Sequence, residues 1–213
     1  MTPNAWQWLW PVAFYLVGSV PTGFLLGRLR GLDIRRHGSG NIGATNVWRV
    51  LGWKWGLAAF ASDFLKGFLP LYLLRTLSFP ETGSWAISVL LVLCGLGAII
   101  GHNYTPWLGF KGGKGIATSA GVLGALMPPV LAVALSLWII ATLITRTVSI
   151  GSLLAAVVLA PMAAWFYPGA WVYFGLATLA GGLAVWRHRS NIQRLLAGTE
   201  PRIEFSSKKK SAS

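Results

Sequence analysis

The stretch Trp85-Ala-Ile-Ser-Val-Leu-Leu-Val-Leu-Cys-Gly-Leu-Gly-Ala-Ile-Ile-Gly101 decides the fold class, because it is strongly apolar and carries no charged side chain. It belongs to an apolar run over 84–103, and about 20 such residues let a helix cross ~30 Å of hydrocarbon. Further apolar runs cover 6–27, 53–77, 115–127, 129–145, 148–167 and 170–186. We therefore expect an all-α, polytopic membrane protein with about seven transmembrane helices.

Composition supports this class. Of 213 residues, 54% are hydrophobic and 11% are charged, and the mean hydropathy of +0.61 lies outside the usual soluble range. The net charge of +13 comes from 18 basic and five acidic residues, and the basic ones are concentrated in the loops. A nucleic-acid binder needs a soluble basic surface, so anionic membrane lipids and anionic substrates are the expected partners, and nucleic acid is not.

The run over 115–145 leaves two readings open. It is either one long, tilted helix or two short helices broken at Pro128-Pro129, since a proline pair ends a helix. Loop charge favours seven spans with the N-terminus outside, which places every basic residue except Lys66 and Arg75 in an inside segment. The C-terminus and the functional loops then face the cytoplasm.

Two further features concern organisation. The first apolar run has no basic segment before it, so we interpret it as a retained span and not as a cleaved signal. We expect residues 1–202 to form a single integral membrane domain and residues 203–213 to form a basic, disordered tail. The single cysteine, Cys94, lies within an apolar run and is interpreted as a packing residue.

Nearly all residues able to do chemistry fall in three basic, glycine-bearing segments, here called the first island (38–49), the second island (101–118) and the third island (188–200). Glycine loops expose backbone N–H groups, and together with Arg, Lys and hydroxyl or amide donors they suit phosphate oxygens. With seven spans all three islands lie on one side of the membrane. The pattern indicates phosphate chemistry at a bilayer surface.

Several familiar sites fail on spacing or context. Gly38-Ser-Gly-Asn-Ile-Gly43 matches GxGxxG but lacks the preceding strand of a dinucleotide site, and Gly109-Phe-Lys-Gly-Gly-Lys114 misses the P-loop spacing. The scattered histidines and acids have no metal-ligand spacing, so neither a metal nor a cofactor is expected. No His-x4-Asp acyltransferase motif and no nucleophile with an evident base is present.

Within the islands, Ser39, Thr45 and Asn46 offer hydrogen bonds and Arg49 offers a fork that matches phosphate. Lys111 and Lys114 both lie on the second island's loop. His188, Asn191 and Arg194 follow an i,i+3 spacing and share one helical face. Asp63 and Lys66 inside the second run, also at i,i+3, are interpreted as a structural ion pair. His102 is interpreted as a packed hydrogen-bonding residue, with a ligand or a base as the alternatives.

The three islands together resemble the motifs of the bacterial PlsY-type acyl-phosphate:glycerol-3-phosphate acyltransferases. Gly18-Ser-Val-Pro-Thr-Gly23 and Asp63-Phe-Leu-Lys-Gly67 also match spans of that family, and the likeness runs from about residue 15 to 202. The resemblance implies an enzyme of the bacterial cytoplasmic membrane. It would transfer a fatty acyl group from acyl phosphate to the 1-hydroxyl of glycerol 3-phosphate, giving lysophosphatidate and phosphate. A contact with the enzyme that makes acyl phosphate is a further expectation.

The resemblance also implies roles for residues. His188 and Asn191 would be catalytic. The residues expected to bind substrate are Ser39, Gly40, Asn41, Thr45, Asn46, Arg49, His102, Lys111, Gly112, Gly113, Lys114, Gly115, Thr118 and Glu200. Which lysine binds phosphate, and whether a substrate phosphate or His188 takes the hydroxyl proton, stays open. The alternative function is a membrane transporter for a phosphorylated solute, although no internal repeat of the kind many transporters contain is visible.

Overall fold

The computed structural model describes residues 2–79 and 84–203, and all the regular elements in these ranges are helices. This confirms the all-α prediction for the described part of the chain. The α-helices are α1 (Trp10–Gly18), α2 (Thr22–Leu29), α3 (Ala44–Leu51), α4 (Trp53–Leu73), α5 (Trp85–Asn103), α6 (Ile116–Leu126), α7 (Pro128–Thr145), α8 (Val148–Phe166), α9 (Trp171–Arg187) and α10 (Arg189–Leu196). Short turns of other helix types cover Ala5–Leu9, Ile34–Arg36, Leu74–Ser78 and Pro106–Leu108. Most of the predicted tail, residues 204–213, lies outside the described residues.

Within the described residues, five helical segments are long and apolar enough to cross a membrane: Ala5–Leu29, Trp53–Ser78, Trp85–Leu108, Pro128–Thr145 and Val148–Phe166. The other two predicted runs correspond to α9, with 17 residues, and α6, with 11 residues. At 1.5 Å per residue α6 is only about 16 Å long, roughly half of the hydrocarbon thickness. The first run is not one continuous helix, because the chain leaves the helical path at Ser19–Pro21 between α1 and α2.

The run over 115–145 forms two helices. Met127 leaves the helical region (φ −139°, ψ 59°), and Pro128 and Pro129 open α7 at the first helical positions. Proline is tolerated there because its missing N–H has no intrahelical partner in any case. Of the two alternatives left open by the sequence, the structure shows two short helices broken at Pro128-Pro129.

Glycines bring the helices into close contact. A Cβ on Gly18 or Gly101 would lie within 2.3 Å of the backbone of α5 or α1 respectively, so these two helices meet backbone to backbone. Gly67 and Gly121 provide the same close approach between α4 and α6. Small residues at helix interfaces are typical of proteins that fold inside a bilayer, where packing replaces the hydrophobic effect as the force between helices.

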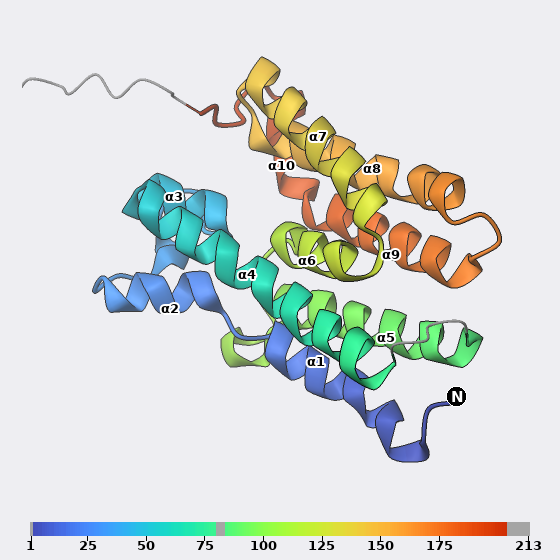
Figure 1. Cartoon of the computed structure of the whole chain (residues 1–213). Coiled ribbons are helices and arrows are strands. Elements are labelled where there is room, and N and C mark those ends of the chain that lie inside the picture. Colours follow the sequence, from blue (N-terminus) through green and yellow to red (C-terminus); the bar gives the residue numbers. More distant parts are fainter. Residues whose placement is uncertain (1, 80–83, 204–213) are drawn as a thin grey trace, which may run out of the picture.

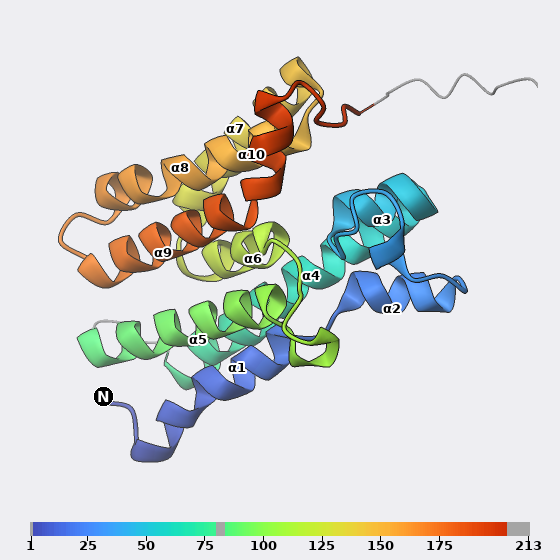
Figure 2. The ribbon, with the colours of Figure 1, turned by 180° about the vertical axis from the view of Figure 1, so that it is seen from behind.

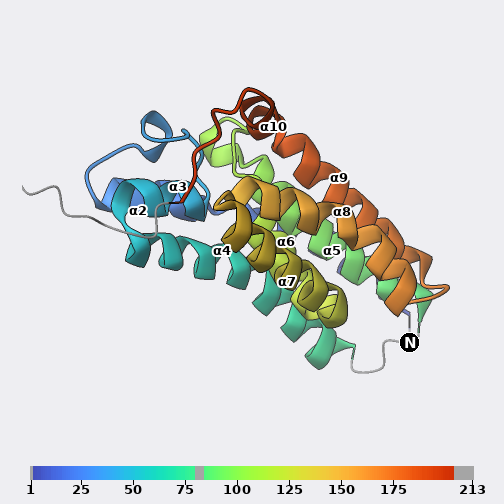
Figure 3. The ribbon, with the colours of Figure 1, turned by 90° about the horizontal axis from the view of Figure 1, so that it is seen from above.

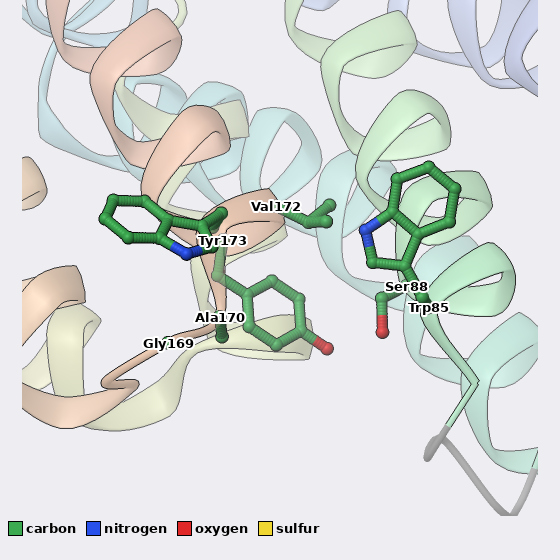
Figure 4. Close-up of a pocket in the computed structure, with 7 residues that line it drawn as sticks. Trp85, Ser88, Gly169, Ala170, Val172 and Tyr173 are labelled. Carbon is green, nitrogen blue, oxygen red and sulfur yellow. The ribbon is translucent and has the colours of Figure 1, made fainter.

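The long helices run roughly side by side and alternate in direction (Figure 1). α2, α3 and α10 gather at the end of the bundle away from the N-terminus, together with the loop between α5 and α6 (Figure 2). All three islands therefore lie at one end of the molecule. At the opposite end, where α5 and α9 begin, a small cavity of about 110 Å3 is lined by Trp85, Ser88 and residues 169–173, none of them charged (Figure 4).

Candidate active-site cleft

A cleft of about 600 Å3 is lined by residues of α3, α4, α6, α7, α8, α9 and α10. Figure 3 shows how these helices are arranged. It has two chemically different parts. The polar end is lined by Ser39, Asn41, Thr45, Arg49, Lys114, Ser149, His188, Asn191, Arg194 and Glu200. The apolar part is lined by Leu57, Phe60, Leu123, Leu131, Leu135, Ala155, Ala156, Leu159 and Ala180.

In the first island, the buried Asn46 side chain fixes the loop. Its Nδ2 donates to the carbonyl oxygens of His37 (3.1 Å) and Asn41 (2.8 Å), and its Oδ1 accepts from Ser39 N at 2.8 Å. Both ends of this amide are therefore used within the protein. One turn later on α3, the exposed Arg49 lines the cleft, and its guanidinium has no hydrogen-bond or ion-pair partner among the described residues.

In the second island, the glycine loop (residues 109–115) is held from two sides. Gly112 N donates to Asn103 O at 3.1 Å and Gly113 N donates to His102 O at 3.0 Å. From α9, the Arg187 guanidinium donates to Gly112 O at 2.8 Å and to Gly113 O at 3.0 Å. The loop is thus clamped between α5 and α9 immediately before Lys114 enters the cleft.

In the third island, a hydrogen-bonded chain joins the loop to the C-terminal segment. The Lys114 ammonium donates to Asn191 Oδ1 at 2.5 Å, and Asn191 Nδ2 donates to Glu200 Oε1 at 2.6 Å. Arg194 Nε donates to the second Glu200 oxygen at 2.7 Å. Asn191 therefore uses its amide to tie the ammonium to the carboxylate and keeps the two groups apart.

The pKa of the Lys114 ammonium is strongly lowered at the polar end. Burial lowers the pKa of its ammonium to about 8; Glu200 opposes this shift, and the guanidinium groups of Arg194, Arg187 and Arg49 reinforce it. A cation surrounded by other cations in a partly buried site is a site prepared for an anion.

The lowered pKa values of His188 and Glu200 keep each group in one protonation state near pH 7. Burial and the Lys114 charge lower the pKa of His188 to about 4, so the ring is neutral near pH 7. Its Nδ1 lies 2.8 Å from Ala184 O and must donate to it, which leaves Nε2 as an acceptor. Burial would raise the pKa of Glu200, but hydrogen bonds from Asn191 and Arg194 hold it below its ordinary value.

Most of the residues predicted from the sequence line the cleft. They are Ser39, Asn41, Thr45, Asn46, Arg49, His102, Lys114, Gly115, His188, Asn191 and Glu200. The other loop residues lie outside the lining: Gly113 is buried, Gly112 is half-buried, and Gly40 and Lys111 are exposed. Thr118 is fully buried, with its carbonyl against Gly67 of α4. Of the two lysines, Lys114 is therefore the one in the cleft.

Three features of the site are not predicted from the sequence. Arg187, which holds the glycine loop, is interpreted there only as a loop charge, although its position directly before the third island could have indicated a role in the site. Arg194 shares a face with Asn191, but its bond to Glu200 depends on the turn after α10. His102 Nδ1 lies 3.5 Å from Asp63 Oδ1, a contact between two helices that no local motif encodes.

The fold and the cleft define an integral membrane protein whose cleft has a cationic end and an apolar continuation. The family model of glycerol-3-phosphate acyltransferase matches residues 8–198, and the chain belongs to this family. Curated relatives named glycerol-3-phosphate acyltransferase include one from Thermosynechococcus vestitus, 44% identical over 90% of this chain and 92% of its own. Another, from Desulforudis audaxviator, is 47% identical over 90% of this chain and 92% of its own.

Two solved structures have the same fold. One is the crystal structure of PlsY (YgiH), an integral membrane glycerol 3-phosphate acyltransferase, in its glycerol 3-phosphate form. It is 39% identical, covers 94% of this chain and 96% of its own, and has a TM-score of 0.84. The lysophosphatidic acid form of that protein is 38% identical over the same shares, with a TM-score of 0.82. The PlsY-type resemblance of the three islands is thereby confirmed.

Proposed function

We propose that this protein transfers a fatty acyl group from acyl phosphate to the 1-hydroxyl of glycerol 3-phosphate, releasing lysophosphatidate and phosphate. The observation that carries the proposal is the continuity of the cleft, in which Lys114 and Arg49 lie at one end and an apolar channel follows. Acyl phosphate has the same two parts, a phosphate and an alkyl chain. The relatives and the PlsY structures, named for glycerol 3-phosphate, support the acceptor.

The chemistry needs no protein nucleophile, because acyl phosphate is a mixed anhydride. The 1-hydroxyl oxygen attacks the acyl carbonyl carbon, the bond from that carbon to the phosphate oxygen breaks, and phosphate leaves with the electron pair. Bringing two anionic substrates together is the main obstacle, and the positive charges of Arg49, Lys114 and Arg194 offset their repulsion. Ser39 and Thr45 supply neutral donors at the same end.

The protonation states indicate which group receives the hydroxyl proton. A phosphate monoester has a second pKa of about 6, whereas the pKa of His188 is about 4. The phosphate is the stronger base, so we infer that a substrate phosphate oxygen takes the proton. His188, neutral and with Nε2 free, orients the hydroxyl by accepting a hydrogen bond.

The apolar part of the cleft fits the acyl chain. Its lining residues Leu57, Phe60 and Leu135 are also exposed on the outside of the bundle, so this part opens sideways between α4 and α7. A chain bound there remains continuous with surrounding lipid, so it reaches the site without leaving an apolar environment. This arrangement explains why the enzyme is embedded in a membrane.

We also infer the topology: seven spans, the N-terminus outside, and the polar end facing the cytoplasm of the bacterial inner membrane. Support comes from charge, since the islands and most basic residues share one end while Arg75 lies toward the other. Exposed tryptophans occur at both ends, among them Trp107 and Trp186 at the island end and Trp165 and Trp171 at the other. Such aromatic belts mark the two membrane interfaces. The polar end would then be accessible to the enzyme that makes acyl phosphate.

The test is turnover by the purified protein with glycerol 3-phosphate and three palmitoyl donors in parallel: palmitoyl phosphate, palmitoyl-CoA and palmitoyl-acyl-carrier protein. We expect phosphate release and lysophosphatidate only with palmitoyl phosphate. Turnover with either thioester and none with the phosphate would refute the donor assignment. Uptake of glycerol 3-phosphate into proteoliposomes without any acyl transfer would favour the transporter, for which neither the family nor the related structures provide support.

A further inference from the structure

A buried ion pair lies at the base of the cleft, inside α4. Asp63 Oδ1 and Lys66 Nζ are 2.7 Å apart, and their side chains are only 3% and 8% exposed. The Lys66 ammonium also donates to Val20 O at 2.8 Å. An isolated carboxylate within a membrane span would be costly, and Lys66 alone suffices to neutralise it.

A third polar residue, His102, lies beside this pair, although the charges of Asp63 and Lys66 already balance. His102 from α5 directs Nδ1 at the same Asp63 oxygen, 3.5 Å away, and this nitrogen has no hydrogen-bond partner among the described residues. Leaving a buried polar atom unpaired costs about 1–3 kcal/mol. The contact with Asp63 therefore does not explain why His102 lies here. The contact made by the opposite edge of its ring does.

That opposite edge supports the glycine loop. A Cβ on Gly113 would lie 2.0 Å from His102 Nε2, so the ring touches the loop backbone and leaves no room for a side chain. The same loop residue donates its N–H to His102 O at 3.0 Å. Since Lys114 follows directly, the ring determines how far the lysine backbone stands from α5.

We propose that Asp63 and His102 are positioning residues for Lys114. The carboxylate attracts the Nδ1 edge of the imidazole across 3.5 Å without a hydrogen bond, the imidazole sets the height of the loop at Gly113, and the loop sets where the ammonium lies in the polar end. Neither side chain needs to touch the anion in this arrangement. The inference rests on the proposed function only in treating Lys114 as a phosphate-binding group.

A double-mutant cycle tests it, with the dissociation constant of inorganic phosphate for the full purified chain as the readout. We expect Lys114→Ala and His102→Ala each to weaken binding about tenfold or more, and the double variant to bind within about threefold of Lys114→Ala alone, since residues acting through one group are not additive. Fully additive losses would overturn the proposal.

The matched control is Leu91→Ala. Leu91 is fully buried on the same helix, and its 11-residue separation from His102 corresponds to about 16 Å along the axis. It should lower stability, and any loss in phosphate affinity should add to that of Lys114→Ala. Coupling as strong as that of His102 would show a general packing defect and would likewise overturn the proposal.

A second cycle tests the contact itself. Gly113→Ala should weaken phosphate binding in the wild-type background, where the new methyl group meets the ring, and should cost little in the His102→Ala background, where the space is free. Equal cost in both backgrounds would contradict the ring–loop contact. If His102→Ala does not fold, His102→Asn, which retains a polar side chain but not the Nε2 edge, replaces it in both cycles.

The choice of probe separates this proposal from the proposed function. Inorganic phosphate needs no acyl donor, so the cycles give a result even if palmitoyl phosphate is not turned over. If palmitoyl phosphate is not turned over but His102 and Lys114 are coupled in phosphate binding, the donor assignment is refuted and the positioning role of Asp63 and His102 stands. If turnover is normal but the losses are additive, the donor assignment stands and the positioning role is refuted.

Discussion

The Lys114 ammonium lies 2.5 Å from the Asn191 amide oxygen, although 77 positions separate the two residues in the sequence. One comes from the glycine loop before α6 and the other from α10, so the contact joins the second and third islands. Through Asn191 the ammonium is linked to Glu200, which it does not touch directly. The cation is thereby held in place while its charge stays available for an anion.

Replacement of this lysine should be far more damaging than replacement of its neighbour on the loop. Lys114→Ala should lower kcat/KM about 10- to 100-fold, as expected for a lost charged hydrogen bond of ~1.5–3 kcal/mol. Lys111→Ala, which removes an exposed ammonium outside the cleft, should stay within about threefold of wild type. Steady-state kinetics on both variants checks this, and equal losses would contradict the assignment of Lys114.

Arg49 should matter more than the buried aspartate of α4. We expect Arg49→Ala to lower kcat/KM about 10- to 100-fold and Asp63→Asn to lower it less, because the aspartate acts at a distance. The control is Arg36→Ala, which removes an exposed guanidinium just before the first island, and its kcat/KM should be near that of wild type. Equal loss of folded protein in the first two variants, measured by size-exclusion chromatography, would undo the argument for a site.

Phosphate affinity should depend on pH through Lys114. Its pKa of about 8 means that the free protein loses this positive charge as the pH rises through 8, so affinity is retained below that pH and declines above it. Lys114→Arg keeps its charge over this range and should remove the decline. Calorimetric titration of both proteins with phosphate from about pH 7 to about pH 9.5 is the measurement, because the ionisation of phosphate itself affects both titrations equally and cancels in their comparison. The same decline in both proteins would point to another group.

The apolar part of the cleft should be blocked selectively. Ala156→Phe places a ring in the space assigned to the acyl chain, whereas Val157→Phe, one residue on, faces outward from α8. We expect the first change to lower kcat/KM for palmitoyl phosphate about tenfold or more, relative to a short-chain acyl phosphate. The second should leave that ratio unchanged. An identical response of both donors to Ala156→Phe would place the chain elsewhere.

Much of the fold was predictable, because the apolar runs mark where backbone groups must be satisfied within a helix. The prediction for 53–77 corresponds to α4 and the turn after it, and the helix break at Pro128 is a direct effect of ring geometry. The short α2 and α3 were not anticipated as separate elements, whereas the shared face predicted for His188, Asn191 and Arg194 assumes a helix such as α10. All three are amphipathic pieces at the end of the bundle, and tertiary contacts, not length, define their bounds.

The candidate site was predictable in its residue types and less so in their roles. Asn46 donates and accepts within its own loop, so its function there is to shape the first island. Lys111 and Lys114 are chemically equivalent in sequence, and the bond of Lys114 to Asn191, across the cleft that it lines, shows which one enters it. Contacts between distant helices decide both points, and no spacing rule within one segment contains them.

The most direct test of the account follows one oxygen atom. Glycerol 3-phosphate labelled with oxygen-18 in its 1-hydroxyl is incubated with palmitoyl phosphate and the purified protein, and both products are analysed by mass spectrometry. Direct acyl transfer predicts equal amounts of lysophosphatidate and phosphate, with the label wholly in the ester oxygen of the lipid. Label in a glycerol bisphosphate, which attack of the hydroxyl oxygen on phosphorus would give together with free palmitate, or lysophosphatidate formed without matching phosphate, would contradict it.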